Sequence, residues 1–253
     1  MRCLEGKVAI VTGAGQGIGR GIALAFAKQG AVVAVAGRTE AKLIDTVRLI
    51  EEAAGRAAAI PCDVSRAEDI ARTVERTVAA FGGIDILVNN AYDGVLGPLL
   101  SVDDEGFMKG IIAGPLASFR FMRACHPHMK ARGGGDIVNL ATSAAVRWDA
   151  SNYGPYAVAK QGIRALTRAA ACEWGKDGIR VVSIAPHARS PSLGRWIDAH
   201  PDEAREFFRT IPLGRIGDCE TDIGTAVATL VGPAMRYLTG ATIPLDGGQA
   251  YFA

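Results

Sequence analysis

The sequence has no stretch that resembles a membrane span and no concentration of charge of one sign. None of its apolar runs approaches the roughly 18 residues that a spanning helix needs, and Glu5 and Lys7 stand where a secretory signal would need its apolar region. The formal net charge is +2 at pH 7, and the basic residues are scattered. This excludes an electrostatic footprint for nucleic acid or for an anionic membrane. We therefore expect a cytoplasmic protein whose partners are small molecules, with no nucleic acid and no membrane among them.

Disulfide and metal-binding patterns are also missing. The five cysteines, at positions 3, 62, 125, 172 and 219, form no C-x-x-C pair and leave an odd count. Neither a disulfide framework nor a zinc site is predicted from them. The four histidines, including His126 and His128 on either side of Pro127, show no metal-ligand spacing. We expect reduced thiols and no bound metal.

What the chain does contain is an alternation of short apolar, β-branched runs with longer amphipathic runs. About half of the 253 residues are apolar, enough for one large α/β domain. The nearly unbroken apolar strands indicate a parallel sheet that is covered on both faces. The predicted strands span 7–11, 31–36, 57–60, 84–88, 136–141, 179–185 and 241–245, and the predicted helices 18–29, 40–54, 66–81, 101–131, 155–174 and 219–231. The predicted fold is a single Rossmann-type, doubly wound domain over residues 1–253 with a seven-stranded parallel sheet.

Glycines cluster directly after the first predicted strand, in "TGAGQGIG" at residues 12–19. Glycine lets the backbone turn tightly and approach a pyrophosphate, which then meets the positive end of the following helix. The strict G-x-G-x-x-G pattern fails because Ile18 occupies its last place, whereas T-G-x-x-x-G-x-G fits. A structural strand-to-helix turn also uses glycine, but this position favours a dinucleotide site. Its predicted contact residues are Thr12, Gly13, Gln16, Gly17, Ile18 and Gly19.

The end of the second strand bears on which dinucleotide binds. A carboxylate there accepts hydrogen bonds from the adenosine ribose of NAD, whereas an arginine pairs with the 2′-phosphate of NADP. The chain has Gly37 where the carboxylate is expected, followed by Arg38. NADP(H) is therefore the preferred prediction and NAD(H) the alternative. For Arg38 itself, the structural alternative is a solvated loop charge.

Two tyrosines precede one lysine in "SNYGPYAVAK", residues 151–160. Tyr153 stands seven positions before Lys160, and Tyr156 stands four before it. A spacing of four places both side chains on one helix face, and Pro155 is favoured in a first helical turn, so the helix is predicted to begin there. A phenol has a pKa of about 10, which a nearby ammonium lowers. Tyr156 and Lys160 are therefore a candidate proton-transfer pair.

The sequence resembles the classical short-chain dehydrogenase/reductase family along its whole length. Several motifs occur in the family's order, which is more specific than any one of them. They are the glycine loop, "DV" at 63–64, "NNA" at 89–91, Ser143, "YAVAK" at 156–160, "AP" at 185–186, and a tail with "PLGRIG", "LTG" and "DGG". The resemblance implies an NAD(P)-dependent enzyme that interconverts a ketone and a secondary alcohol.

The resemblance also implies further cofactor contacts. It assigns Asp63 and Val64 to the adenine, and Asp63 as a helix cap is the structural alternative. Gln16 argues slightly against NADP, because relatives that prefer NADP often carry a basic residue inside the glycine loop. The implied contacts are Asp63, Val64, Asn89, Ala91, Tyr156, Lys160 and Pro186.

The proton chemistry follows from the same resemblance. A ketone that accepts a hydride becomes an alkoxide and needs a proton, which Tyr156 would donate with the help of Lys160. Ser143 would hydrogen-bond the substrate oxygen. The family spacing of thirteen residues to the tyrosine selects Ser143, whereas alignment on Asn139 selects Thr142. We predict Ser143; a hydroxyl that merely satisfies the strand's end is the alternative.

Tyr153 has an alternative role in a related branch. The enoyl reductases of the same superfamily use Tyr-x-x-Met-x-x-x-Lys, which would select Tyr153. That branch usually lacks the glycine loop found here, so Tyr153 is predicted to form a wall of the substrate pocket.

Three positions depart from the family pattern. The family's asparagine, thought to anchor a water in a proton relay, falls at Gly114, and we hypothesise that a backbone carbonyl freed at Pro115 holds the water instead. Tyr92 replaces the glycine of "NNAG", and its bulk is expected to shape the pocket. The usual Pro-Gly after the sixth strand reads Pro186-His187. His187 either brings a titratable group near the pocket or is an ordinary loop histidine.

The interval 186–218, rich in Pro, Arg and aromatic residues, is the longest irregular interval and is predicted to form a substrate-binding lid. Its aromatic side chains would suit a bulky or lipophilic carbonyl; the alternative is that they only pack the lid. The aromatic candidates are Trp148, Trp196, Phe207 and Phe208, and the predicted substrate-pocket residues are Tyr92, Trp148, Tyr153, His187 and Trp196.

The resemblance also implies a homotetramer built on the helices at 101–131 and 155–174. A nucleotide-binding homologue that has lost efficient catalysis, acting as a sensor or partner subunit, is the alternative function, motivated by Gly114 and His187. The intact Ser143, Tyr156 and Lys160 favour the enzyme.

Overall fold

The computed structural model describes residues 2–146 and 152–250, which contain one sheet of seven parallel strands in the order β3-β2-β1-β4-β5-β6-β7. The strands are β1 Val8–Thr12, β2 Val32–Gly37, β3 Arg56–Pro61, β4 Ile86–Asn89, β5 Gly135–Leu140, β6 Ile179–Pro186 and β7 Thr242–Leu245. The predicted doubly wound sheet is confirmed. Its strand order reverses between β1 and β4, which is where ligands bind in sheets of this kind.

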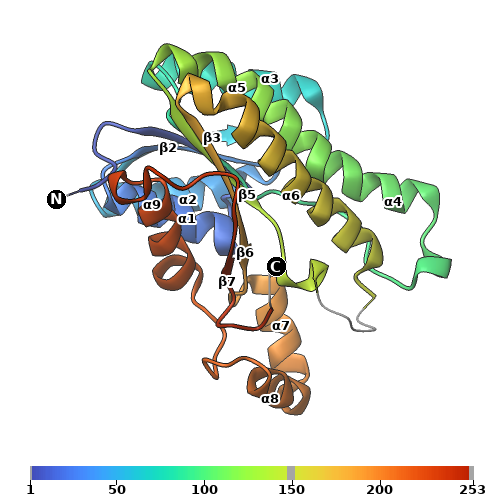
Figure 1. The fold of residues 1–253 in the computed structure, drawn as a ribbon. Helices are drawn as coiled ribbons and strands as arrows, with labels where there is room; N and C mark the ends of the chain where they lie inside the picture. The colour runs from blue at the N-terminus through green and yellow to red at the C-terminus, as the bar shows by residue number, and fades with distance from the viewer. Residues whose placement is uncertain (1, 147–151, 251–253) are drawn as a thin grey trace.

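Helices cover both faces of the sheet (Figure 1). The faces are distinct in their packing, since α1, α2 and α9 bury side chains against one and α3, α5 and α6 against the other. The helices are α1 Gly17–Lys28, α2 Glu40–Glu52, α3 Ala67–Phe81, α4 Asp104–Ile111, α5 Ala117–Ala131, α6 Gly154–Trp174, α7 Pro191–Ala199, α8 Pro201–Arg209 and α9 Thr225–Leu230. This two-sided cover explains why the strands are apolar on both faces.

The long helix predicted over 101–131 is interrupted. α4 and α5 are joined by a π-helical turn, Ile112–Leu116, that contains Pro115. Because proline has no N–H to donate, the regular α-helical hydrogen bonds cannot continue through it. The Ala117 N–H bonds the carbonyls of Ile112 and Gly114 instead. Such π-turns are frequent at functional sites.

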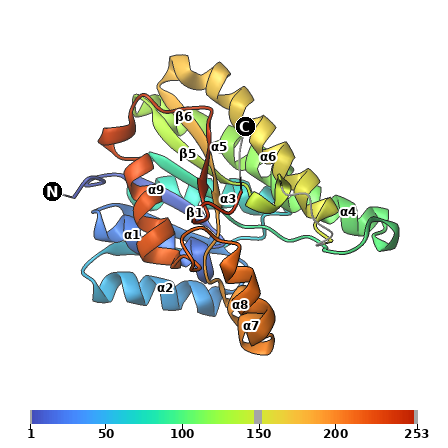
Figure 2. The ribbon, with the colours of Figure 1, turned by 60° about the horizontal axis from the view of Figure 1, so that its bottom comes forward.

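The interval 186–218 is more regular than predicted, because it contains α7 and α8. Each helix has a proline in its first turn, where proline is favoured. The Ser190 side chain also accepts a hydrogen bond from the Leu193 N–H and caps α7. Figures 1 and 2 show α7 and α8 side by side at one end of the molecule. The segment is therefore a helical hairpin and not an irregular loop.

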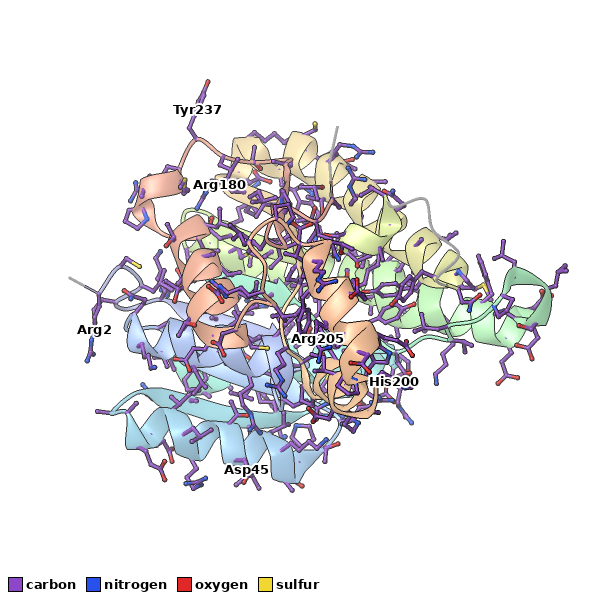
Figure 3. All side chains as sticks on the ribbon, turned by 90° about the horizontal axis from the view of Figure 1, so that it is seen from below. Arg2, Asp45, Arg180, His200, Arg205 and Tyr237 are labelled. Carbon is purple, nitrogen blue, oxygen red and sulfur yellow. The ribbon has the colours of Figure 1, made fainter. Side chains whose placement is uncertain are left out.

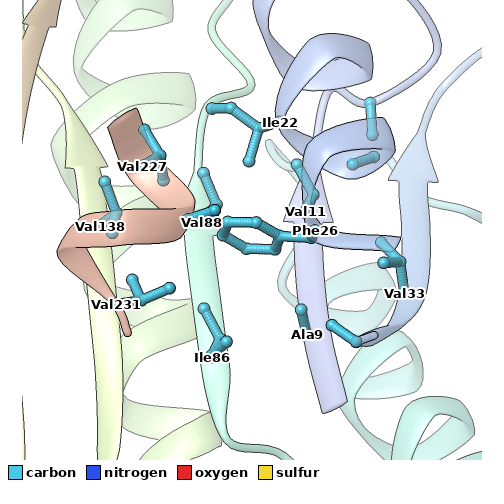
Figure 4. Close-up of a cluster of buried hydrophobic side chains, with 14 of the residues drawn as sticks. Ala9, Val11, Ile22, Phe26, Val33, Ile86, Val88, Val138, Val227 and Val231 are labelled. Atoms are coloured by element: carbon cyan, nitrogen blue, oxygen red, sulfur yellow. The ribbon is translucent and has the colours of Figure 1, made fainter. Parts of the chain in front are cut away.

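Charged side chains such as Asp45 and Arg205 lie on the outside of the molecule (Figure 3), whereas the sheet is enclosed by apolar ones. Figure 4 shows Phe26 of α1 among valines of β1, β2 and β4. Replacing a buried phenylalanine of this kind with alanine costs about 3–5 kcal/mol. This packing fixes α1, and with it the glycine loop that opens α1.

No helix in the described part of the chain is long and apolar enough to cross a membrane. Within residues 2–146 and 152–250, no group of three or more His, Cys, Asp or Glu side chains is arranged to hold a metal ion.

Candidate active site

The loops that follow strands β1 to β6 line a cleft of about 1090 Å³ at the carboxyl edge of the sheet. Most of the predicted site residues lie on its walls. Those that line it are Gly13, Gln16, Gly17, Ile18, Arg38, Asp63, Val64, Ala91, Tyr92, Tyr156, Lys160 and Pro186. Those that do not are Thr12, Gly19, Asn89, Ser143, Tyr153, His187 and Trp196. Trp148 lies outside the described residues.

The glycine loop is tied to the loop after β4. The buried Thr12 hydroxyl donates to the Val88 carbonyl (3.2 Å) and accepts from the N–H groups of Asn90 (2.9 Å) and Ala91 (3.0 Å). The Asn90 amide donates back to the Thr12 carbonyl (2.8 Å). A Cβ atom on Gly13 would lie 2.6 Å from the Asn90 amide nitrogen, so only glycine fits there. Asn90, the middle residue of the "NNA" motif, was not among the predicted site residues, yet it holds the loop and lines the cleft.

Asn89 and Asp63 make contacts within the protein. The Asn89 amide donates to the Asn139 side chain (2.8 Å), and the Asn139 amide donates to Thr167 (3.0 Å), so this pair cross-links β4, β5 and α6 in the core. The Asp63 carboxylate accepts from the N–H (2.9 Å) and the hydroxyl (2.7 Å) of Ser65, while the residue also lines the cleft. Asp63 therefore does not cap α3, whose N-cap residue is Arg66, and its contact with the adenine stays a prediction.

Basic side chains gather at the end of β2. The Arg38 guanidinium donates to the Asp93 carboxylate (2.7 Å), which also pairs with Lys109 (3.2 Å). Burial raises the pKa of Asp93, but the hydrogen bonds from Lys109 and Arg38 outweigh it, so the net pKa lies below its usual value. The Lys42 ammonium donates to the Gln16 side chain (2.7 Å). Lys42 was not among the predicted site residues, although its place in the first turn of α2, directly after β2, was a usable signal.

Lys160 and Tyr156 lie together at the base of the cleft. α6 begins at Gly154, one residue before the predicted start, and places Tyr156 in its first turn. The buried Lys160 ammonium donates to the Leu140 carbonyl (2.7 Å) and lies 5.6 Å from the centre of the Tyr156 ring. Burial lowers the pKa of Lys160 to about 7.

The pKa of Tyr156 differs from the expectation. Burial raises the pKa of this phenol, a hydrogen bond with the Thr142 side chain lowers it in part, and Tyr153 raises it further, so the net direction is upward. The net shift of this pKa is therefore opposite to the predicted lowering. The physical reason is that desolvation of the phenolate outweighs the favourable contact.

The two candidate hydroxyls at the end of β5 have different partners. The Thr142 side chain forms the hydrogen bond with Tyr156. The Ser143 hydroxyl is buried and donates to the Asp246 carboxylate (2.5 Å). Asp246 also accepts from the N–H groups of Gly248 (3.0 Å) and Ala250 (3.1 Å). Asp246, from the "DGG" tail, was not predicted to take part in the site.

The aromatic residues of the α7–α8 hairpin pack mainly on one another. The Trp196 and Phe207 rings meet edge to face with centres 5.9 Å apart, and the His187 ring lies 5.3 Å from that of Phe207. The Tyr153 ring lies 6.0 Å from Tyr156, beside the cleft. The alternative in which the lid aromatics pack the lid thus has direct contacts in its favour.

A dinucleotide fits this cleft on structural grounds. A pyrophosphate needs close approach to backbone, which the glycine loop at the start of α1 offers. The cleft extends from the cations Arg38 and Lys42 past the glycine loop to Tyr156 and Lys160. Fold and site together define an α/β dinucleotide-binding protein in which a tyrosine lies beside a buried lysine.

Comparisons with known proteins agree with this class. A family profile described as "Enoyl-(Acyl carrier protein) reductase" matches residues 13–250. The 12alpha-hydroxysteroid dehydrogenase of a Clostridium species is 38% identical over 257 residues, 98% of either chain. The 3beta-hydroxysteroid dehydrogenase 1 of Eggerthella lenta is 35% identical, covering 98% of this chain and 95% of the relative. A 7 alpha-hydroxysteroid dehydrogenase solved with NADH and 7-oxo glycochenodeoxycholic acid has a TM-score of 0.93 and 31% identity, with 98% and 96% of the chains covered.

The chain belongs to the classical short-chain dehydrogenase/reductase family. It is therefore an NAD(P)-dependent oxidoreductase that acts on CH–OH or C=O groups.

Proposed function

We propose that this protein interconverts a bulky ketone and the corresponding secondary alcohol with NADP(H), and that Tyr156 is its general acid and base. The observation that carries the proposal is the pairing of the half-buried Tyr156 with the buried Lys160 at the base of the dinucleotide cleft. The dinucleotide supplies or accepts the hydride when bound. The Tyr156 hydroxyl gives a proton to the substrate oxygen in reduction, and its phenolate takes the proton back in oxidation.

The hydroxyls of Thr142 and Ser143 have different roles in this proposal. Thr142 bonds Tyr156 and so orients the phenol. Ser143 remains the predicted partner of the substrate oxygen. Its single hydroxyl proton is donated to Asp246 in the structure, so Ser143 stabilises the substrate oxygen only after it turns away from that carboxylate.

The preference for NADP(H) is supported by the charges at the end of β2. Gly37 carries no carboxylate, and the cations Arg38 and Lys42 line the same part of the cleft. Lys42 reaches Gln16, so it places a positive charge beside the glycine loop where Gln16 supplies none. A 2′-phosphate is a stronger partner for two cations than a neutral ribose hydroxyl. NAD(H) is the alternative, because the similar 7 alpha-hydroxysteroid dehydrogenase was solved with NADH.

For the substrate, we propose a hydroxysteroid or oxosteroid. The named relatives act on three positions of the steroid nucleus. Enoyl reduction through Tyr153 is disfavoured, because Tyr153 does not line the cleft whereas Tyr156 does.

We propose further that the protein is a cytoplasmic homotetramer. All five cysteines are free thiols, which is consistent with a reducing compartment. The helices expected to form the interface, α4, α5 and α6, carry exposed apolar side chains, including Phe119 and Val158.

The test is oxidation of a panel of hydroxysteroids that differ in the position and face of the hydroxyl, with NADP⁺ or NAD⁺. We expect turnover with at least one of them, higher kcat/KM with NADP⁺, and a loss of about 10²-fold or more in Tyr156→Phe with the dinucleotide still bound. The double variant Arg38→Ala/Lys42→Ala is expected to reverse the cofactor preference. Absence of turnover on steroids, ketones and alcohols by wild-type protein that binds the dinucleotide would favour the catalytically impaired homologue.

A further inference from the structure

Tyr92 stands between the catalytic pair and the helix that lacks the family's asparagine. Its ring meets the Tyr156 ring edge to face, with centres 5.1 Å apart. The Lys160 ammonium lies 4.8 Å from the centre of the Tyr92 ring, nearer than its 5.6 Å to Tyr156. An aromatic face attracts a cation at such distances, more strongly when the cation is removed from water. Tyr92 therefore contacts both members of the pair.

Three glycines surround this ring. A Cβ atom on Gly114 would lie 3.3 Å from Cε2 of Tyr92 and 3.5 Å from the Ala159 Cβ. A Cβ atom on Gly110 would lie 2.8 Å from the Tyr92 hydroxyl oxygen, and one on Gly94 would be closer still. Any larger side chain at these positions would have to displace the phenol. The ring thus occupies the space that a side chain at position 114 would fill.

The Tyr92 hydroxyl is buried, and within residues 2–146 and 152–250 it has no hydrogen-bond partner. Burial raises the pKa of Tyr92 to about 12, and the neighbouring Tyr156 and Asp93 add to this. The phenol is therefore neutral near pH 7. Its contribution to the pair comes from the ring and not from a charge.

We propose that Tyr92 and Gly114 are one compensated replacement: the Tyr92 ring fills the space of the family's asparagine at position 114 and positions Lys160 and Tyr156 by direct contact, whereas the asparagine is expected to act through a water. Tyr92 is accordingly a positioning residue, and Gly114 is glycine because Tyr92 is present. The inference rests on the proposed carbonyl–alcohol activity for its kinetic test, but the coupling between positions 92 and 114 is testable without it.

The first experiment is a double-mutant cycle on the full chain with Tyr92→Gly, Gly114→Asn and both together, which restores the family's pair of residues. Each single variant is expected to lose about tenfold in kcat/KM and to unfold at lower temperature, whereas the double variant recovers most of both losses. Recovery of thermal stability is read without substrate, so it stands even where wild type turns over no steroid. Additive losses would overturn the proposal, as would a gain of turnover in Gly114→Asn alone.

The second experiment separates the effect of the aromatic ring of Tyr92 from the effect of its size. In alcohol oxidation, kcat/KM rises with pH as Tyr156 becomes a base. The titratable side chains near the ammonium are Tyr92 and Tyr156, with Tyr153 behind Tyr156 and Asp93 beside Tyr92, the last bound to Arg38 and Lys109.

Tyr92→Leu keeps an apolar side chain but removes the aromatic face that favours the ammonium. We expect the midpoint of the pH profile to move to higher pH in Tyr92→Leu and to stay in place in Tyr92→Phe, whatever the change in kcat. Equal shifts in the two variants, or no shift in either, would contradict the role of the ring.

Discussion

Burial of Lys160 serves the proposed proton transfer and weakens the fold. The ammonium has left water for a site where its partners are the Leu140 carbonyl and two aromatic rings. Desolvation lowers its pKa from 10.5 to about 7. An amine that titrates near neutrality can pass a proton in either direction, which an ordinary lysine does poorly.

Lys160→Met is expected to raise the free energy of unfolding at pH 6–7 by a few kcal/mol, while abolishing turnover. The wild-type fold disfavours the protonated lysine, so burying Lys160 lowers the free energy of unfolding by its full amount below pH 7. This destabilisation disappears as the pH rises from about 7 to about 10.5, because the unfolded chain then also loses the proton. The stability difference should therefore shrink across that window. Denaturant unfolding at several pH values measures it, and a difference independent of pH would contradict the assignment.

At the scale of elements, the glycine loop is held by close packing beneath it. α1 lies against the π-helical turn Cys219–Gly224 that precedes α9. A Cβ atom on Gly21 would overlap the Cys219 carbonyl, and one on Gly224 would lie 2.5 Å from the Gly21 carbonyl. The two backbones approach so closely because both positions are glycine.

Gly21→Ala is expected to destabilise the protein by about 1–3 kcal/mol, because the methyl group must push against backbone. It should also weaken dinucleotide binding, since α1 opens with the glycine loop. Gly175→Ala is the matched control: it has helical dihedral angles and no atom within 4 Å of its Cβ position. That substitution should stabilise by about 0.4–1 kcal/mol. Thermal unfolding of both variants checks this, and equal effects would show that α1 can shift away from Cys219.

At the scale of the whole molecule, exposed apolar side chains occur on the helices expected to form the tetramer. Phe119 on α5 is 38% exposed and Val158 on α6 is 49% exposed. Scattered single apolar residues are normal on a protein surface, so their position on these helices, and not their number, supports an interface.

Val158→Glu is expected to convert the tetramer into a smaller species, because a carboxylate is costly at the centre of an interface that excludes water. Ile44→Glu on α2, where Ile44 is 55% exposed, is the control and should leave the assembly intact. Mass photometry or light scattering distinguishes the species. A Val158→Glu protein of unchanged mass would place the interface elsewhere.

Patterns local in sequence determined the parallel sheet, the glycine loop after β1 and the tyrosine–lysine spacing on α6. Strand period and helix spacing depend on neighbours a few residues apart, so they can be recognised without coordinates. The helical hairpin α7–α8 was missed because a segment rich in proline, arginine and aromatic residues was taken to indicate a loop, whereas Pro191 and Pro201 each open a helix.

The tertiary structure alone decided which partners meet across long separations. Asp246, near the C-terminus, bonds Ser143, and Lys42 of α2 bonds Gln16 at the start of α1. Tyr92 fills the space beside Gly114. The sequence by itself identified Tyr156 and Lys160 because four residues on one helix fix their relative position. The environment of that pair depends on desolvation and on packing between β4, β5, α5 and α6, which are properties of the assembled core and not of any one segment.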